Sequence, residues 1–221
     1  MTVATTPKIK FCGITSLEDA ELAVRAGAWA IGLNFWPNSP RRSTIDAAIE
    51  IGAALRRQIE VTGIFVNATL DEIAATADTA ALTMVQLHGD EGPSFCDEVR
   101  RRTGCKMIKA VRVRSGADIQ ALTRFHTDYH LLDSYRPGMP GGTGETFAWE
   151  LARSHRGRVP LILSGGLTPA NVAEAIAAVH PFAVDVASGV EPDGGPPNRK
   201  DPEKLEAFAA AVRAGTGSLV R

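Results

Sequence analysis

The sequence lacks the features that would place it in a membrane or on a nucleic acid. Its longest apolar stretches, such as Trp29 to Leu33, are far shorter than the roughly 20 residues that a bilayer-crossing helix needs. The formal net charge of the 221 residues is −1, with basic and acidic residues mixed along the chain. The sequence therefore contains no concentration of positive charge that would bind the phosphate backbone of a nucleic acid. We expect neither a membrane partner nor a nucleic-acid partner.

Cysteine and metal-ligand patterns are also scarce. There are three cysteines and no CxxC pair, so any disulfide scheme leaves one thiol unpaired. This usage suits a reducing compartment, and the first residues show no charged-then-apolar signal pattern, so we expect a cytoplasmic protein. We expect no metal site, and we expect structural roles for four histidines that have no ligand spacing: His126, His130, His155 and His180.

Short apolar runs alternate with helical patterns from end to end of the chain. Eight runs are expected to be strands: Ile9 to Phe11, Trp29 to Phe35, Val61 to Val66, Met84 to Leu87, Met107 to Val111, Tyr129 to Leu132, Val159 to Leu163 and Ala183 to Val186. Eight stretches are expected to be helices: Leu17 to Ala26, Ile45 to Arg57, Leu70 to Ala77, Pro93 to Arg102, Ala117 to Phe125, Trp149 to Ser154, Pro169 to Val179 and Pro202 to Ala214.

Several helix starts carry explicit capping signals. Thr69 and Glu72 have capping-box spacing, and proline follows a capping residue at Thr168-Pro169 and at Asp201-Pro202. Eight strand-helix units predict an α/β protein with a single (β/α)8 TIM barrel, whereas a doubly wound sheet usually has fewer strands. Because no linker divides the chain, we expect one domain over residues 1–221, with its core from about 8 to 214 and short loose termini.

In such a barrel the residues just after each strand form one ring around one mouth, where ligands and catalytic groups collect. The ring has a thiol at Cys12 and a carboxyl at Asp133, which face each other if the first and sixth strands lie across the barrel. Its other members are Asn34 with Arg41 in the loop beyond, Asn67, His88, Arg112, Ser164-Gly165-Gly166 and Ser188-Gly189.

Glycines are concentrated in the loops after the last three strands. They stand at Gly141-Gly142-Thr143-Gly144, at Gly165-Gly166 and at Gly189. Glycine lets backbone N–H groups approach an anion without a Cβ in the way. A single pair of glycines would merely turn the chain, but three such loops in succession favour a phosphate site, which barrels often build there.

A thiol and a carboxyl beside a phosphate site suit acid-base chemistry on a small phosphorylated sugar. Cys12 is open to three interpretations: a small buried hydrophobe, a nucleophile, or a general base. Asp133 is either a catalytic acid or a structural cap, and Arg41 is either a solvated charge or a ligand for a substrate carboxylate. No spacing favours a role for His88. The residues alone indicate a phosphosugar isomerase and do not specify its substrate.

Six sets of residues at these strand ends have a specific order and spacing. They are Lys10-Phe11-Cys12-Gly13-Ile14-Thr15, Ser39-Pro40-Arg41, Gln86-Leu87-His88-Gly89, Leu132-Asp133 with Gly141-Gly142-Thr143-Gly144, Leu163-Ser164-Gly165-Gly166-Leu167 with Asn171-Val172, and Asp185-Val186-Ala187-Ser188-Gly189-Val190-Glu191. Each motif alone is weak. Together they resemble the phosphoribosylanthranilate isomerase family of tryptophan biosynthesis.

The resemblance implies an Amadori rearrangement of N-(5'-phosphoribosyl)anthranilate to 1-(2-carboxyphenylamino)-1-deoxyribulose 5-phosphate, with no metal or organic cofactor. It implies that Asp133 is the general acid, that Cys12 is the thiolate base and that Arg41 binds the anthranilate carboxylate. The implied phosphate ligands are Gly142, Thr143, Gly144, Gly165, Gly166, Ser188 and Gly189. His88 and Asp185 lie in matching segments and are further candidate site residues.

Two alternatives stay open at this point. Another phosphate-binding barrel, such as a pentose-phosphate epimerase or a thiamine phosphate synthase, would call for metal ligands or a pyrophosphate site. A non-catalytic phosphate-binding barrel would leave Cys12 and Asp133 without a role. The expected partner is a small phosphorylated substrate, and the protein is expected to be a monomer or a homodimer.

Overall fold

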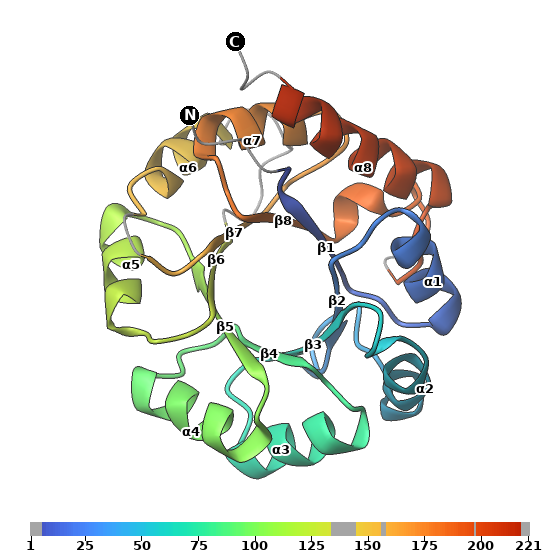
Figure 1. The fold of residues 1–221 in the computed structure, drawn as a ribbon, viewed down its shortest axis with the longest axis vertical. Coiled ribbons are helices and arrows are strands. Elements are labelled where there is room, and N and C mark those ends of the chain that lie inside the picture. The colour runs from blue at the N-terminus through green and yellow to red at the C-terminus, as the bar shows by residue number, and fades with distance from the viewer. Residues whose placement is uncertain (1–5, 134–144, 156–157, 197, 218–221) are drawn as a thin grey trace.

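The computed structural model describes residues 6–133, 145–155, 158–196 and 198–217. Within these residues, parallel strands form a closed barrel in the order β1 to β8, and β8 pairs back onto β1. Helices surround the strands as an outer ring (Figure 1). The predicted α/β class and the (β/α)8 barrel are confirmed.

Each strand is followed by a helix, as the alternation of patterns predicts. The strands are β1 (Lys8–Cys12), β2 (Ala30–Asn34), β3 (Glu60–Phe65), β4 (Met84–Leu87), β5 (Lys106–Arg112), β6 (Tyr129–Asp133), β7 (Leu161–Ser164) and β8 (Ala183–Val186). The helices are α1 (Leu17–Arg25), α2 (Ile45–Leu55), α3 (Leu70–Thr79), α4 (Pro93–Thr103), α5 (Gly116–Ala121), α6 (Glu145–Ala152), α7 (Val172–Val179) and α8 (Pro202–Gly217). Short 3-10 turns lie at Leu122–Arg124 and Ser188–Val190.

Local capping chemistry explains where several helices begin. Thr69 and Glu72 form the predicted capping box of α3, and α8 begins at Pro202 as predicted. The predicted start of a helix at Pro169 is wrong, because α7 begins at Val172. The side chain of Asn171 accepts a hydrogen bond from the backbone N–H of residue 168 at 2.8 Å and donates one to the carbonyl of residue 166 at 3.0 Å. These bonds hold residues 168–171 as a turn before the helix.

The barrel interior has an apolar layer and, nearer the carboxyl ends of the strands, a polar layer. Alternate side chains along each strand point inward. The apolar layer consists of Ala30, Met84, Ile108, Ala110, Leu131, Ile162 and Ala183. Gln86 and Asp185 lie two residues further along β4 and β8 than Met84 and Ala183, and with Lys10 of β1 and Thr62 of β3 they are at most 5% exposed. This polar layer lies directly beneath the ring of strand ends.

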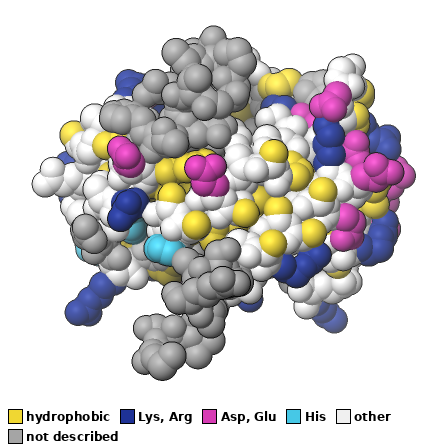
Figure 2. Space-filling view, turned by 90° about the horizontal axis from the view of Figure 1, so that it is seen from above, with side chains coloured by type: hydrophobic (Ala, Val, Ile, Leu, Met, Phe, Trp, Pro, Cys, Tyr) yellow, Lys and Arg dark blue, Asp and Glu magenta, His cyan; other side chains and the backbone are white. Residues whose placement is uncertain are grey.

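The outer surface carries charges of both signs. On the face shown in Figure 2, basic and acidic side chains are interspersed. No helix in the described ranges has both the length and the apolar character needed to cross a bilayer.

A buried histidine pair lies outside the barrel wall. His130 is in β6 and is 2% exposed, and its Nδ1 lies 3.0 Å from Nε2 of His155. Burial, together with the neighbouring His155, lowers the pKa of His130 to about 4. Burial also lowers the pKa of His155. Both rings therefore stay neutral at pH 7 and share a hydrogen bond.

We predict that this pair makes the fold sensitive to acid. The unfolded chain protonates His130 near the ordinary pKa of about 6.5, whereas the folded chain does so only near 4. Between these values the unfolded state binds more protons, so stability falls as the pH decreases. Between pH 7 and pH 5 this linkage costs about 2 kcal/mol. Urea unfolding measures this effect. Between pH 7 and pH 5 the free energy of unfolding should fall by about 2 kcal/mol less in His130→Gln than in the wild-type protein.

The control is His126→Gln, which changes an exposed histidine four residues before His130. This variant should lose as much stability between pH 7 and pH 5 as the wild-type protein does. If His130→Gln lost as much stability between pH 7 and pH 5 as the wild-type protein, the buried pair would not be the cause of the acid sensitivity.

Candidate active site

Cys12 and Asp133 both stand at strand ends and point into the mouth of the barrel. Cys12 is the last residue of β1, and Asp133 is the last residue of β6 and shares its face of the strand with Leu131 of the apolar layer. Both side chains are half-buried. On the shorter way around the barrel only β7 and β8 separate the two strands. The thiol and the carboxyl therefore face one mouth from different sides.

A buried ion pair lies beneath the thiol. Lys10 is fully buried, and its Nζ lies 2.8 Å from Oδ1 of Asp185. The hydroxyl of Ser164 donates to the other oxygen of Asp185 at 2.9 Å. Breaking such a buried pair by removing one partner typically costs about 3–5 kcal/mol. Asp185, a site candidate from the sequence, is thus the counter-ion that keeps Lys10 charged below the mouth.

Gly32 of β2 leaves room for Lys10 and Cys12 to meet. It pairs in register with Cys12. A Cβ on Gly32 would lie 3.0 Å from Sγ of Cys12 and 3.1 Å from Nζ of Lys10. Because glycine has no such atom, the ammonium group of Lys10 and the sulfur of Cys12 can both occupy the space beside Gly32.

Opposing effects act on the ionisation of Cys12. Burial raises the pKa of the thiol, because the thiolate would lose its hydration. Lys10 opposes this rise, Asp185 adds to it, and Lys200 opposes it. For Lys10 itself, burial lowers the pKa, but attraction to Asp185 and Cys12 outweighs burial and raises the pKa above its ordinary value. Lys10 is therefore charged, while Cys12 is mainly a thiol in the free protein at neutral pH.

Arg41 lies against the loop that follows Cys12. A Cβ on Gly13, which has a φ of +73°, would lie 2.6 Å from Cδ of Arg41. Nε and Nη2 of Arg41 each donate a 2.6 Å hydrogen bond to Glu191, one to each carboxylate oxygen. Nζ of Lys200 lies 3.2 Å from Oε1 of the same carboxylate. Glu191 thus joins the loop after β2 to the segment after β8.

His88 lies next to Asp133. Its Nε2 is 3.4 Å from Oδ2 of Asp133, and its Nδ1 is 3.1 Å from the amide Nε2 of Gln86. An amide nitrogen only donates, so Nδ1 is the acceptor of that bond and the proton of a neutral ring is on Nε2. The structure thereby directs an N–H of His88, a site candidate from the sequence, toward the carboxyl.

The glycine loops after β7 and β8 pack against each other. Gly165 and Gly166 have φ values of +95° and +67°, which side-chain-bearing residues rarely adopt. A Cβ on Gly189 would lie 2.0 Å from the carbonyl oxygen of Leu167, so only glycine allows this approach. Ser188 and Gly189 form the 3-10 turn beside it. Three further candidates lie outside the described residues: Gly142, Thr143 and Gly144.

Three residues around the site were not predicted from the sequence to be site residues: Lys10, Glu191 and Lys200. Lys10 could have been predicted, because it lies two residues before Cys12 in a strand and the two side chains must therefore share a face. No local pattern links Glu191 and Lys200 to Arg41, which lies far from both along the chain. Within the described parts of the chain, no three His, Cys, Asp or Glu side chains are grouped as a metal ion would need.

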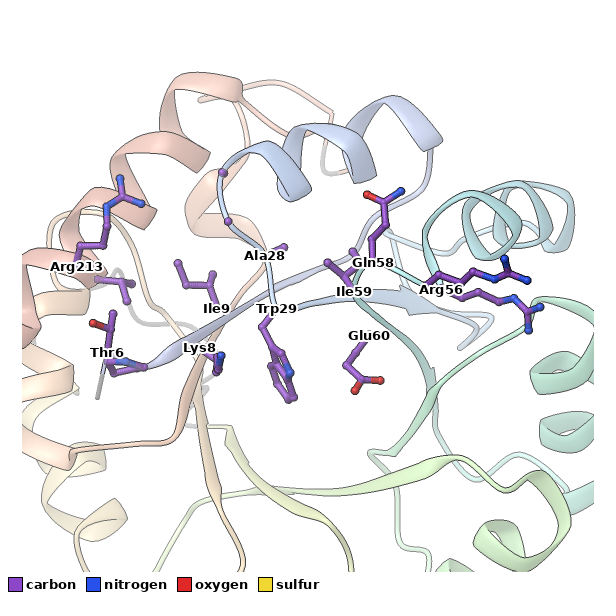
Figure 3. A pocket seen from close by; sticks show the side chains of 15 residues that line it. Thr6, Lys8, Ile9, Ala28, Trp29, Arg56, Gln58, Ile59, Glu60 and Arg213 are labelled. Atoms are coloured by element: carbon purple, nitrogen blue, oxygen red, sulfur yellow. The ribbon is translucent and has the colours of Figure 1, made fainter. Parts of the chain in front are cut away.

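A hollow of about 580 Å³ lies at the opposite end of the barrel, where the strands begin. Figure 3 shows Thr6, Lys8, Trp29 and Glu60 around it, close to the starts of β1, β2 and β3. None of the candidate site residues lines this hollow. The group of chemically matched side chains is therefore at the other end, at the mouth formed by the strand ends.

The chain is similar in sequence and in fold to known proteins. The family model described as N-(5'phosphoribosyl)anthranilate (PRA) isomerase matches residues 9–211. An N-(5'-phosphoribosyl)anthranilate isomerase of Citrifermentans bemidjiense is 48% identical over 206 residues, which cover 93% of this chain and 97% of that relative. The crystal structure of phosphoribosyl anthranilate isomerase from Thermotoga maritima has a TM-score of 0.83 at 40% identity and covers 94% of this chain and 99% of its own.

A further crystal structure shows a phosphoribosyl anthranilate isomerase in complex with reduced 1-(o-carboxyphenylamino)-1-deoxyribulose 5-phosphate. It is 36% identical, with a TM-score of 0.78, and the match covers 94% of this chain and 99% of that chain. Since the family model matches nearly the whole barrel and the relatives match in sequence along almost their entire length, the chain belongs to the N-(5'-phosphoribosyl)anthranilate isomerase family.

Proposed function

We propose that this chain catalyses the reaction for which its family is named, the Amadori rearrangement of N-(5'-phosphoribosyl)anthranilate in tryptophan biosynthesis. One observation carries the proposal: Cys12 and Asp133 face one mouth from β1 and β6, with the loops after β7 and β8 between them. An acid and a base on different sides of a small sugar suit proton transfers at two separate atoms.

Asp133 is the proposed general acid. It protonates the furanose ring oxygen, the ring opens, and the amino nitrogen of the anthranilate forms a Schiff base with C1'. The N–H of His88, 3.4 Å from the carboxyl, supports an orientation of Asp133 toward the mouth.

Cys12 is the proposed general base. As a thiolate it removes the proton from C2' and gives an enolamine, which tautomerises to the ketone. The positive charge of Lys10 directly below the sulfur supports this role, because it favours the anionic form of the thiol.

The two anionic ends of the substrate have separate proposed sites. Arg41 has five N–H donors, of which Glu191 accepts two, and its planar head suits the anthranilate carboxylate. The proposed phosphate ligands are backbone groups of Gly142, Thr143, Gly144, Gly165, Gly166, Ser188 and Gly189. The close packing of the loops after β7 and β8 supports a shared anion site there.

We also propose that the chain acts in the cytoplasm as one domain over residues 1–221, as a monomer or a homodimer, on a small phosphorylated substrate and without a cofactor. The barrel elements, of which the first begins at Lys8 and the last ends at Gly217, support a single unit.

The reaction is tested by following the fluorescence of the anthranilate-bearing substrate. Purified protein should consume N-(5'-phosphoribosyl)anthranilate at a rate proportional to the enzyme concentration. An epimerase, a thiamine phosphate synthase or a non-catalytic binding barrel would leave the substrate untouched, and such a result would refute the proposal.

Replacing Cys12 tests the base. Because a hydroxyl is far less acidic than a thiol, Cys12→Ser should lower kcat by about 10²- to 10⁴-fold. The wild-type rate should rise from pH 6.5 to pH 9, because burial raises the thiol pKa and the thiolate fraction grows with pH. Steady-state rates across this range measure both effects. A Cys12→Ser enzyme with normal rates would remove Cys12 from the chemistry.

Replacing Asp133 tests the acid. The amide in Asp133→Asn keeps the shape of the side chain but cannot deliver the proton, so turnover should be abolished while a product analogue still binds nearly as tightly. Calorimetric binding and the fluorescence assay measure the two properties separately. If the variant turned over at the wild-type rate, another group would have to supply the proton.

A further inference from the structure

Buried and half-buried ion pairs are packed around Cys12. Among the described residues, two sets lie on the β1, β2 and β8 side of the mouth: Lys10 with Asp185, and both Arg41 and Lys200 with Glu191. Across the mouth, Asp133 has His88 beside it. The fully buried Asp19 of α1 adds a carboxylate that interacts with Lys200 and lies 3.9 Å from Nε of Arg199. Of these charges, Lys10 and Lys200 favour a thiolate at Cys12, and Asp185 opposes it.

Lys200 lies on the β8 side of Cys12. Its side chain is fully buried, and its Nζ donates a 3.0 Å hydrogen bond to the carbonyl oxygen of Ala187. In the register of the barrel seam, Phe11 pairs with Val186. The next residues along the two chains, Cys12 and Ala187, therefore lie beside each other. This places the ammonium group of Lys200 on the β8 side of the thiol.

The segment that carries Lys200 is tied to the loop and helix that follow Cys12. The hydroxyl of Thr15 donates to the carbonyl of Asn198 at 2.8 Å, and Arg199 lies 3.2 Å from the carboxylate of Glu18. These contacts fix the backbone on the residues just before Lys200. The buried ammonium group is held in place from both ends, by its segment and by its hydrogen bonds.

We propose that Lys200 is a positioning residue for the base: its buried ammonium group, together with that of Lys10, stabilises the thiolate form of Cys12. This inference rests on the proposed role of Cys12 as the base that removes the substrate proton. Lys200 acts through Cys12 by its charge, which counts for more in the poorly solvated mouth than it would in water.

The charged forms of Cys12 and Lys200 favour each other. Lys200 counteracts the rise that burial causes in the pKa of the Cys12 thiol. Burial lowers the pKa of Lys200, while Glu191 and Cys12 raise it and Arg41 lowers it. A negative sulfur therefore helps to keep Lys200 charged, and a charged Lys200 helps to keep the sulfur negative.

Lys200 can be tested without leaving a buried carboxylate unpaired. If Lys200 is replaced, Glu191 keeps both of its hydrogen bonds to Arg41. Replacing Lys10 would instead leave Asp185 without its cation, and the variant would combine a loss of stability with any effect on the thiol.

The experiment measures how the alkylation of Cys12 by iodoacetamide depends on pH, with the modified peptide followed by mass spectrometry. Lys200→Gln keeps an N–H donor but removes the charge, and the midpoint should rise by about one pH unit. At pH 8 kcat should fall by about tenfold, with little change in KM. Lys200→Arg keeps the charge and should keep a midpoint close to that of the wild-type protein.

The matched control is Lys204→Gln. Lys204 contacts the backbone carbonyl of Glu191 at 2.9 Å and the carboxylate of Asp193, so the change removes one lysine charge from the same region. Its alkylation midpoint should not move. Thermal unfolding checks that each variant is folded, and Lys200→Met provides a second charge-free side chain if Lys200→Gln does not fold.

An unchanged midpoint in the charge-free variants would overturn the inference, even if their activity fell. So would an equal shift in Lys204→Gln or in Lys200→Arg. The result is distinguishable from a failure of the proposed function. If Cys12→Ser kept full activity, Cys12 would not be the base, yet the alkylation midpoint would still show whether Lys200 stabilises its thiolate.

Discussion

The pairing of β1 with β8 closes the barrel and sets Lys10 directly opposite Asp185. Because the ammonium group of Lys10 is fully buried, it needs that carboxylate, and only this register provides it. A shift of one residue would turn Lys10 and Cys12 to the outside of the barrel together. The position of the thiol in the mouth therefore depends on the same interaction that compensates the buried charge.

Burial and charge act against each other at the mouth. The barrel wall takes the thiol partly out of water and makes its anion costly, while Lys10 and Lys200 make the same anion favourable. The proposed substrate brings two more negative groups, for which Arg41 and backbone N–H groups are the proposed ligands. Glu191 orients Arg41 for the proposed contact with the substrate carboxylate, because its own carboxylate binds one edge of the guanidinium group.

The periodicity of the sequence predicts the barrel because each strand is a short apolar run and each helix carries its own pattern. It fails at Pro169, where the side chain of Asn171 competes with the helix for backbone hydrogen bonds. Cys12 and Asp133 could be found because parallel strands end at one edge. The contact between Arg41 and Glu191 could not, because the closed fold alone brings these residues together. The position of Lys200 near Cys12 could not be predicted for the same reason. That of Lys10 could, because side chains two residues apart in a strand share a face.

A crystal structure of this chain with the reduced product analogue tests most directly whether the substrate lies across the mouth between Cys12 and Asp133. The account predicts the carboxylate of the analogue at Arg41, its phosphate on backbone N–H groups of the loops after β7 and β8, and its sugar carbons between the thiol and the carboxyl. A phosphate bound at Arg41, or a sugar out of reach of Cys12, would contradict it.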